Sequence, residues 1–329
     1  MSSWNTSCSE SELSGGNQTD PATYQPSAAV IILQASVMIF TIITDIIGNI
    51  LVILSVLLNK KLHTPGNIFV ISLSVADLIV AVYPYPLITI AILQKKWTLG
   101  YGQCKVSSTI MALGLSGSVY NILAIAINRY LCICHSSKYD KLYSMKNTYC
   151  YVFLTWILIV ILLLPVTSTD AIQYDSRVYS CIFSLNTNLS LNLALASFQF
   201  IIPVSIVIFC YMRIWVLVIQ AKYRVRRDNK QNLKLNELRN FLTMFVVFVL
   251  FAICWGPFGI IGLTVGFSPR GKAPKVADWL IVLSYFMAYF NSCLNGIIYG
   301  VFNRNFRNEY KRIVLSLCTC MLRQPQKLT

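Results

Sequence analysis

Seven long apolar runs recur along the chain, and they constrain its fold more than any other feature. They cover approximately residues 28–58, 66–93, 106–134, 148–168, 192–219, 240–266 and 277–301. Each run is near the length of about 20 residues that a helix needs to cross the hydrocarbon core of a membrane. Only 12% of the 329 residues are charged, whereas a soluble domain has about a quarter. The sequence therefore predicts an all-α membrane protein, a bundle of seven transmembrane helices.

The basic residues are distributed unevenly between the two sides of this bundle. On the side that includes the C-terminus, the loops, the tail and the adjoining ends of the spans are counted together. They hold 20 of the 27 Lys and Arg residues and 4 of the 12 acids. The other side holds 7 basic and 6 acidic residues, and Asp45 and Asp77 lie within spans. The positive-inside rule then predicts an extracellular N-terminus and a cytoplasmic C-terminus in a multi-pass plasma-membrane protein. Topology and contact with anionic membrane lipid explain the net charge of +15, and no nucleic-acid partner is expected.

The predicted outer segments carry two kinds of covalent feature. The extracellular tail, residues 1–27, has N-glycosylation sequons at Asn5 and Asn17 and no recognisable cleavable signal peptide. Cys104 lies at the head of the third span and Cys181 in the loop before the fifth, so that a disulfide between them would hold this loop over the third helix. Cys8 is expected to stay unpaired. The remaining cysteines lie in spans or on the reducing cytoplasmic side, where free thiols are expected.

An amphipathic segment follows the region of seven predicted spans, residues 28–301. One helical face of residues 302–317 carries Phe302, Phe306, Tyr310, Ile313 and Leu317. This pattern predicts a helix that lies on the inner membrane surface. Cys318 and Cys320 open the predicted cytoplasmic tail, residues 318–329, and are predicted palmitoylation sites. A helix without attached lipid is the alternative.

Several function classes are disfavoured by the sequence. No His or Cys cluster predicts a metal site, and no Ser, His and Asp set lies where a membrane hydrolase would need it, so an enzyme is not expected. The absence of an inverted repeat disfavours a transporter. The last apolar run also lacks the lysine that a retinal protein requires. A receptor is the class that these observations leave.

Short motifs occur in sequence order, one in each predicted helix. They are Gly48-Asn49, LSVAD ending at Asp77, NRY at 128–130, Trp156, Pro203, CWGP at 254–257 and NGIIY at 295–299. Over its whole length the chain thus resembles the rhodopsin-like class of G-protein-coupled receptors. Asn128 stands where most of that class has an acid, and Gly296 where most have proline. These departures, with the runs GNIFVISLSVADLIVAVYPYPL and YFMAYFNSCLN, are similar to the melatonin receptor family.

The resemblance implies a switch at the cytoplasmic ends of the helices. In the resting state Arg129 is expected to pair with Glu237 at the start of the sixth helix, an interaction worth about 1 kcal/mol near water. When the sixth helix swings outward, Arg129 would contact the G protein. Asn128 cannot hold Arg129 by charge, and an arginine that only snorkels to the surface is the alternative. The expected switch set is Asn128, Arg129, Tyr130, Glu237, Asn295 and Tyr299.

Asp77 lies in the middle of a span, where a lone carboxylate costs roughly a few kcal/mol. The resemblance surrounds it with a polar network of Asn49, Asp77, Ser118, Asn291, Ser292 and Asn295. This network could hold a sodium ion or a protonated Asp77, and both interpretations stay open. No other metal or cofactor is expected. Asp45 lies one turn before Asn49 and faces the same interior.

The resemblance also implies a ligand pocket in the outer half of the bundle. The expected lining is Met111, Ala112, Leu115, Val166, Phe183, Leu185, Gln199, Trp255, Phe258, Gly259 and Tyr285. These side chains are mostly apolar and aromatic, which predicts a small, neutral, lipophilic ligand such as melatonin. Met111 replaces the carboxylate of amine receptors, so a charged amine is not expected. Trp255 at the pocket floor, beside the helix kink expected at Pro257, would transmit ligand binding to the sixth helix.

Four pocket positions depart from the melatonin receptor family. Val166 replaces an asparagine, Leu185 a glutamine, Gln199 a histidine and Gly259 an asparagine, and each lost hydrogen bond typically costs about 1 kcal/mol. Three interpretations follow. The chain is a melatonin receptor coupled to inhibitory G proteins that lower cyclic AMP, or a melatonin-related receptor with another ligand or none. The third, a non-signalling heteromer partner, is disfavoured by the intact Arg129, Trp255 and Tyr299. The occurrence of a receptor dimer is left open.

Overall fold

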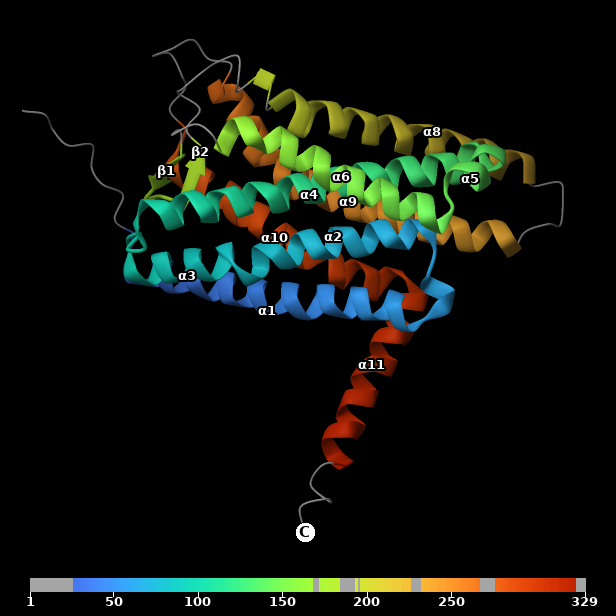
Figure 1. Cartoon of the computed structure of the whole chain (residues 1–329), viewed down its shortest axis with the longest axis horizontal. Coiled ribbons are helices and arrows are strands. Elements are labelled where there is room, and N and C mark those ends of the chain that lie inside the picture. Colours follow the sequence, from blue (N-terminus) through green and yellow to red (C-terminus); the bar gives the residue numbers. More distant parts are fainter. Residues whose placement is uncertain are drawn as a thin grey trace, which may run out of the picture.

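A computed structural model describes residues 26–167, 172–183, 193–194, 196–225, 232–266 and 276–323. Its long helices run side by side in one elongated bundle (Figure 1). Within these described residues, seven helical segments are long and apolar enough to cross a membrane. The predicted seven-helix bundle is therefore confirmed.

The first half of the chain forms three spans. They comprise α1 (Ala28–Leu58), the short 3₁₀ turn η1 (Lys60–Leu62), α2 (Pro65–Val82), α3 (Pro84–Gln94) and α4 (Gly100–Cys134). The second span is interrupted at Tyr83, because Pro84 and Pro86 have no backbone N–H to continue the hydrogen-bond ladder. The third span begins at Gly100, six residues before the predicted start. Residues 100–105 are mostly polar, so hydrophobicity alone could not reveal this first turn.

The second half adds four spans and a hairpin. Its elements are α5 (Ser136–Leu142), α6 (Met145–Thr167), β1 (Ile172–Asp175), β2 (Ser180–Phe183), the π-helical turn η2 (Ser197–Ile201), α8 (Ile202–Val225), α9 (Asn232–Gly266), α10 (Asp278–Phe302) and α11 (Arg304–Arg323). The α8 and α9 helices continue beyond the apolar runs, to Val225 and back to Asn232. Of the segment between the fifth and sixth apolar runs, residues 220–225 and 232–239 are therefore helical, which their polar composition concealed.

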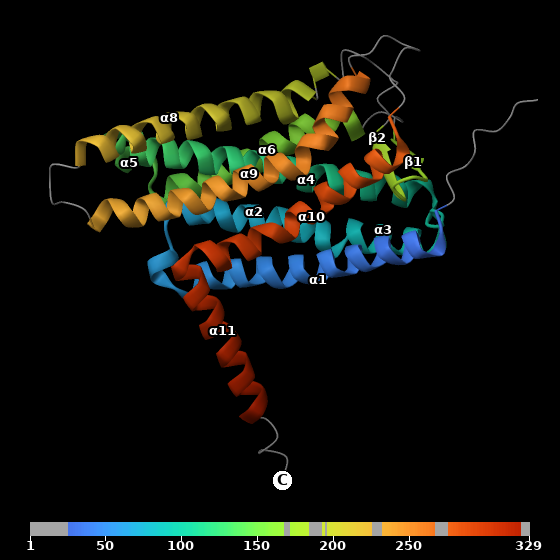
Figure 2. The same ribbon diagram turned by 180° about the vertical axis from the view of Figure 1, so that it is seen from behind.

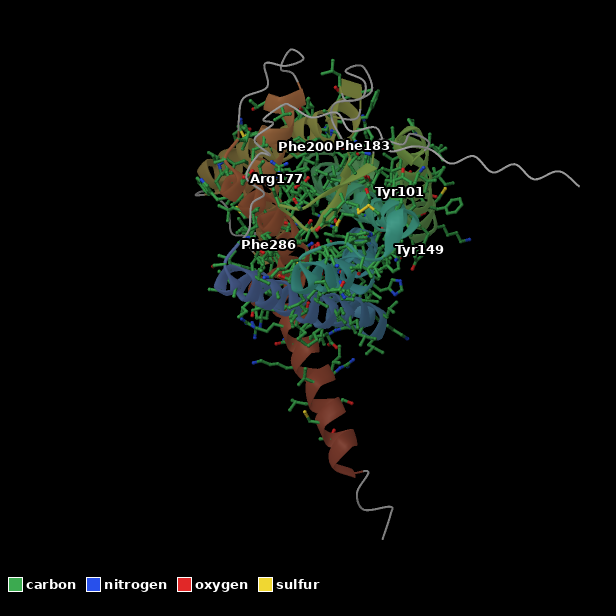
Figure 3. All side chains as sticks on the ribbon, turned by 90° about the vertical axis from the view of Figure 1, so that its left-hand side faces the viewer. Tyr101, Tyr149, Arg177, Phe183, Phe200 and Phe286 are labelled. Carbon is green, nitrogen blue, oxygen red and sulfur yellow. A yellow bond between two sulfur atoms is a disulfide. The ribbon has the colours of Figure 1, made fainter. Side chains whose placement is uncertain are left out.

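The β1–β2 hairpin covers one end of the bundle. The two strands are antiparallel, with Tyr174 opposite Cys181. A disulfide joins Cys181 to Cys104 in the first turns of α4, as predicted. Figure 3 looks onto this end of the molecule, and the disulfide lies between the hairpin and α4.

Burial is inverted relative to a soluble protein. Large apolar side chains such as Leu33 and Phe153 point outward, with 63% and 65% of their surface exposed. Asp45 and Asp77, in contrast, are completely or almost completely buried among the helices. This arrangement suits an apolar solvent, because lipid tails contact the outward side chains while polar groups find partners inside.

The α11 helix leaves the end of α10 and projects away from the bundle axis (Figures 1 and 2). Phe306 and Ile313 are buried where it begins, and the Tyr310 hydroxyl donates to the Gly296 carbonyl at 3.1 Å. The helix continues to Arg323, six residues beyond its predicted end, and includes Cys318, whose side chain is exposed.

Three predicted modification sites lie outside what the structure describes. Asn5 and Asn17 precede the described residues, and for Cys320 only the backbone, within α11, is described. Glycosylation and palmitoylation therefore stay predictions.

Candidate functional site

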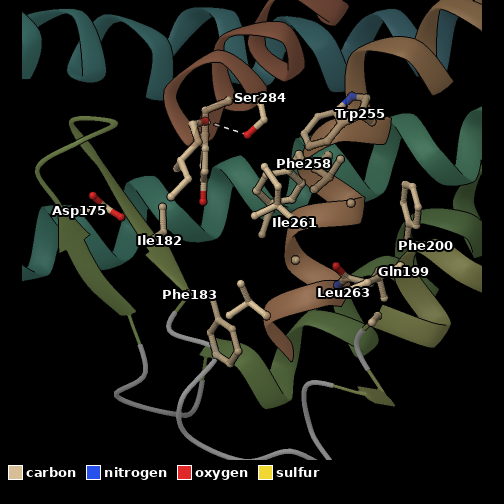
Figure 4. A pocket seen from close by; sticks show the side chains of 18 of the residues that line it. Asp175, Ile182, Phe183, Gln199, Phe200, Trp255, Phe258, Ile261, Leu263 and Ser284 are labelled. Carbon is tan, nitrogen blue, oxygen red and sulfur yellow. Dashed lines mark hydrogen bonds between the residues drawn. The ribbon is translucent and has the colours of Figure 1, made fainter. Parts of the chain in front are cut away.

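A cavity of about 670 Å³ lies in the half of the bundle that the hairpin covers (Figure 4). This volume is typical of a site for a small molecule. Its walls come from α4, the end of α6, η2, α9 and α10, and the hairpin closes the outer side. The structure brings eight of the eleven predicted pocket residues together here: Ala112, Leu115, Phe183, Gln199, Trp255, Phe258, Gly259 and Tyr285.

Three predicted pocket residues are not part of this lining. Met111 lines a much smaller adjoining cavity of about 10 Å³, which shares Leu115 and Trp255 with the large one. Val166 lies in α6, but its side chain is outside the described part, and Leu185 is outside the described residues altogether. The expected effects of two of the four replacements, Val166 and Leu185, therefore stay predictions.

Aromatic side chains form a continuous column beside the cavity. The Trp255 ring lies 6.2 Å from Phe251 below it and 5.7 Å from Phe258 above it, between ring centroids. Phe258 meets Tyr285 edge to face at 5.0 Å, so the column passes from α9 to α10. It continues through Tyr289, whose centroid lies 6.1 Å from Tyr285. A displacement of Trp255 would therefore be transmitted through close ring contacts on two helices.

Gly259 makes room for an aromatic neighbour. A Cβ atom placed on Gly259 would lie 3.0 Å from Cζ of Phe200, which is closer than side chains normally approach. The Phe200 ring therefore occupies the space that a side chain at position 259 would fill, between η2 and α9. The sequence analysis treated Gly259 only as a lost hydrogen-bonding position, and its packing role needed the fold.

The cavity wall also contains polar groups that the sequence analysis missed. Within the described part of the chain, Ser116 Oγ, Gln199 Nε2, Trp255 Nε1 and Tyr174 Oη are buried atoms without a hydrogen-bond partner. Only Gln199 and Trp255 were predicted. Ser116 could have been found, because it lies four residues after Ala112 and so on the same helical face. Burial raises the pKa of Tyr174 to about 12, so its hydroxyl is neutral at physiological pH.

An ion-pair cluster closes the outer rim of the cavity. The Arg177 guanidinium contacts the Asp175 carboxylate at 2.5 Å and Asp278, the first residue of α10, at 3.3 Å. Hydrogen bonds to Asp175 raise the pKa of Arg177 further above its usual value, so it stays charged. The cluster connects the hairpin to α10 across the cavity mouth. No sequence pattern pairs this loop with that helix, which is why it was not predicted.

The predicted polar network is assembled around Asp77. The Ser118 hydroxyl donates to Asp77 Oδ1 at 3.0 Å, and Asn295 Nδ2 donates to Oδ2 at 2.7 Å. Asn49 donates to the Ser292 carbonyl at 3.4 Å, and Ser292 Oγ forms a 2.8 Å hydrogen bond with the Tyr85 hydroxyl. Because Tyr85 lies 5.4 Å from Tyr289, ring to ring, the network meets the aromatic column. Asn291 is also buried and lines the small cavity.

Asp45 extends this network with a second carboxylate. Its Oδ1 accepts a hydrogen bond from Asn49 Nδ2, and Asn49 in turn donates to the Ser292 carbonyl of the network. Asp45 Oδ2 and Asn49 Oδ1 are buried without a partner in the described part of the chain. Two buried carboxylates without a cation are costly, so this centre suits a proton or a small cation with oxygen ligands.

At the opposite end of the bundle, Arg129 lies folded onto the start of α2. Its Nη2 donates to Asn128 Oδ1 at 2.8 Å, and the guanidinium rests against Gly66. A Cβ atom on Gly66 would overlap Arg129 Nη2 and lie 2.9 Å from Cζ. Asn128 in turn donates to the Tyr139 hydroxyl at 3.4 Å. Asn128 thus restrains Arg129 by a hydrogen bond, without an acid.

Of the remaining switch residues, Tyr130 and Tyr299 pack against aromatic rings, and Asn295 belongs to the network around Asp77. Tyr130 packs 5.9 Å from Phe209, between ring centroids, and Tyr299 is almost fully buried with its ring 5.2 Å from Phe306. Glu237 lies in α9, but its side chain is outside the described part of the chain. The expected pairing of Glu237 with Arg129 therefore stays a prediction.

Comparison with known proteins gives one consistent result. Residues 48–299 match the family "7 transmembrane receptor (rhodopsin family)". Melatonin receptor type 1C of Xenopus laevis is 60% identical over 87% of this chain and 68% of its own length. Melatonin receptor type 1A of Mus musculus is 57% identical over 88% of this chain and 82% of its own length. Melatonin receptor type 1C of Gallus gallus is 55% identical over 98% of this chain and 90% of its own length.

Proposed function

The chain belongs to the rhodopsin family of seven-transmembrane receptors and, within it, to the melatonin receptors, and on this basis we propose that its cavity binds melatonin. Membership makes it a multi-pass plasma-membrane receptor and not an enzyme, with a small ligand and a G protein as partners. We further propose that the G protein is of the inhibitory class, so that the ligand lowers cyclic AMP.

The character of the cavity supports a neutral ligand. Its only described ionic groups, Asp175 and Arg177, pair with each other at the outer rim and leave the inner walls apolar, aromatic or uncharged. Phe183 projects into the space below the hairpin, where a flat ring can stack on it (Figure 4). The observation that carries the proposal is the convergence of Phe183, Trp255 and Tyr285 on this one cavity, in a chain more than half identical to melatonin receptors.

Signal transmission begins at Trp255 on the cavity floor. Pro257, two residues later, has no N–H to bond the backbone of the preceding turn, which weakens α9 at this level. A ligand that displaces Trp255 bends α9 there and moves its cytoplasmic end outward. The end of α9 then separates from α4 and exposes Arg129. Arg129 leaves its position against Gly66 and contacts the G protein.

We propose that the centre between Asp45 and Asp77 holds one sodium ion. Asp77, Asp45 and Asn49 supply the oxygen atoms that a hard cation prefers, and two of these oxygens have no partner in the described residues. The bound cation would offset the carboxylate charges and favour the resting arrangement. Thermal stability measured in sodium chloride and in choline chloride tests this proposal. A difference that disappears in Asp77→Asn supports it, whereas equal stability in both salts favours a protonated Asp77.

Radiolabelled melatonin binding to membranes that contain the receptor tests the main proposal. Saturable binding, with a fall in cyclic AMP that is lost when inhibitory G proteins are inactivated, is expected. Absence of binding at high receptor expression would overturn it and favour a melatonin-related receptor with another ligand. The double variant Val166→Asn with Leu185→Gln should strengthen binding, because it restores two hydrogen-bonding side chains, each worth about 1 kcal/mol.

A third experiment addresses the heteromer interpretation. Arg129→Ala should abolish signalling while leaving melatonin binding nearly intact, because Arg129 lies at the opposite end of the bundle from the cavity. Unchanged basal and ligand-driven signalling in this variant would instead favour a partner that modulates another receptor.

A further inference from the structure

Two donors of the cytoplasmic switch are left unsatisfied in the resting arrangement. Within the described part of the chain, the Tyr299 hydroxyl and Arg129 Nε are buried without a hydrogen-bond partner. A buried polar group in this state costs free energy, so a movement that gives it a partner is favoured. The contacts with Gly66 and Asn128 hold Arg129 in place. A separate contact has to hold the inner end of α10, which carries Tyr299.

Two glycines at the inner end of α10 lie directly against neighbouring helices. Gly296 and Gly300 are four residues apart, about one helical turn. A Cβ atom on Gly296 would lie 2.6 Å from the backbone of Gly48, so α1 and α10 touch there. A Cβ atom on Gly300 would lie 2.8 Å from Cε2 of Tyr310 in α11. The missing side chains therefore let both α1 and the Tyr310 ring reach the backbone of α10.

Tyr310 is hydrogen-bonded to α10 as well as packed on it. Its hydroxyl donates to the Gly296 carbonyl at 3.1 Å. A carbonyl oxygen has two lone pairs, so it can accept this bond in addition to the one from the helix N–H four residues later. The fully buried Phe306 ring lies 5.2 Å from Tyr299 and 6.4 Å from Tyr310, between ring centroids. Tyr310 thus contacts α10 at the turn that contains Tyr299.

The first half of α11 is also fixed to α1. Asn59, at the C-terminal end of α1, donates from Nδ2 to Glu309 Oε1 at 2.6 Å. Glu309 is only 8% exposed, and Arg312 Nε lies 3.0 Å from its other carboxylate oxygen. Because Tyr310 directly follows Glu309, the bond to Gly296 comes from a residue whose backbone is held beside α1. Helices α1, α10 and α11 therefore contact one another pairwise where α11 leaves the bundle (Figure 2).

We propose that Tyr310 is a positioning residue of the cytoplasmic switch. Its hydroxyl holds the inner end of α10 against α1 in the resting conformation, and Tyr299 stays without a partner as a result. When this bond opens, the inner end of α10 moves away from α1, and the Tyr299 hydroxyl reaches a hydrogen-bonding group or water. The active conformation is then more populated. This role rests on the proposed function in one respect, since it assumes that the switch controls a G protein.

Tyr310→Phe tests this role, because it removes the hydroxyl and keeps the ring. Ligand-independent G-protein activation, normalised to receptor number at the cell surface, should rise about fivefold, as the loss of one hydrogen bond predicts. In a Tyr299→Phe background, which has no hydroxyl to satisfy, the same substitution should change activation less than about twofold. Tyr143→Phe is the matched control and should leave activation unchanged, because Tyr143 lies at the same end of the bundle but stacks on Tyr139 of α5.

A distance measurement reports the same release without a G protein. Spin-labelled amino acids replace Leu57 and Val301 in the purified full chain, since both are 57% exposed at the inner ends of α1 and α10. Double electron–electron resonance should show a population with a longer distance between the labels. This population should be about fivefold larger in Tyr310→Phe than in the wild type.

Equal distance distributions in the wild type and Tyr310→Phe would overturn the role of Tyr310. An equal rise in Tyr143→Phe, or an undiminished rise in the Tyr299→Phe background, would overturn it as well. If Tyr310→Phe shifts the distances in a receptor that does not lower cyclic AMP, the role of Tyr310 is supported and only the proposed class of G protein is contradicted.

Discussion

Gly66 is the residue whose replacement should most directly release the cytoplasmic switch. The guanidinium of Arg129 occupies the space where a side chain at position 66 would begin. In Gly66→Ala, the new methyl group would overlap Arg129 Nη2 and force the guanidinium away from α2. Because only the far end of a flexible side chain has to move, the helices can keep their positions. The substitution should therefore change the conformational equilibrium much more than the stability of the fold.

The size of the effect follows from the interaction that is lost. Arg129 donates to Asn128 at 2.8 Å, and a hydrogen bond to a charged group contributes about 1.5–3 kcal/mol. Arg129 is partly exposed, so the lower value applies. About 1.5 kcal/mol corresponds to a roughly tenfold shift between resting and active conformations. A receptor with about 2% active molecules at rest would reach roughly one-fifth.

Ligand-independent G-protein activation, normalised to receptor number at the cell surface, measures this shift. Gly102→Ala is the matched control, because Gly102 also lies in the first turn of a spanning helix but has open space around its Cβ position. In an Asn128→Ala background, Gly66→Ala should add almost nothing, since both substitutions remove the same restraint. Unchanged basal activity in Gly66→Ala would refute the reasoning. The reasoning would also be refuted if Gly66→Ala raised basal activity in the Asn128→Ala background by as much as it does in the wild type.

Two further substitutions test contacts elsewhere in the bundle. Gly296→Ala should lower the thermal midpoint, because its Cβ would lie 2.6 Å from the backbone of Gly48 and the α1 and α10 helices would have to separate, at a cost of about 1–3 kcal/mol. Arg177→Ala should accelerate both entry and release of melatonin by up to about fivefold, because it removes the half-exposed contact with Asp278 across the cavity mouth. Thermal unfolding and binding kinetics measure the two effects.

Each of these substitutions has a control in the same chain. Gly256→Ala also adds a methyl group to a spanning helix, but nothing lies within 4 Å of its Cβ position, so the midpoint should not fall. Lys96→Ala removes an exposed basic residue at the same end of the bundle as Arg177 and should leave the ligand kinetics unchanged. A lowered midpoint in Gly256→Ala, or similar kinetics for Lys96→Ala and Arg177→Ala, would contradict the proposed contacts.

The lengths of the apolar runs predicted the number and order of the spans, because a membrane requires a minimum apolar length of every helix that crosses it. It could not predict where the spans end. The first turn of α4, residues 100–105, and the first turns of α9, residues 232–239, are polar helix that hydrophobicity does not distinguish from loop. The pocket residues came from the family resemblance, which found the apolar lining. It did not find Arg177, because its ion pairs join two elements that no sequence pattern connects, and it did not include Ser116, although Ser116 lies on the same helical face as Ala112.

The glycines show most clearly why a sequence alone leaves the site incomplete. Gly259 and Gly296 are recognisable as departures from a family pattern, and a departure to glycine suggests only that a side chain has been lost. In the fold, another part of the chain occupies the space that a side chain at each position would need. This is the Phe200 ring beside Gly259 and the backbone of α1 beside Gly296. Gly66 attracts no notice in the sequence, yet it provides the resting place of Arg129. Restoring a family side chain at position 259 should therefore disturb the packing of Phe200 instead of recovering a ligand contact, so affinity for melatonin should be regained by changes at Val166 and not at Gly259.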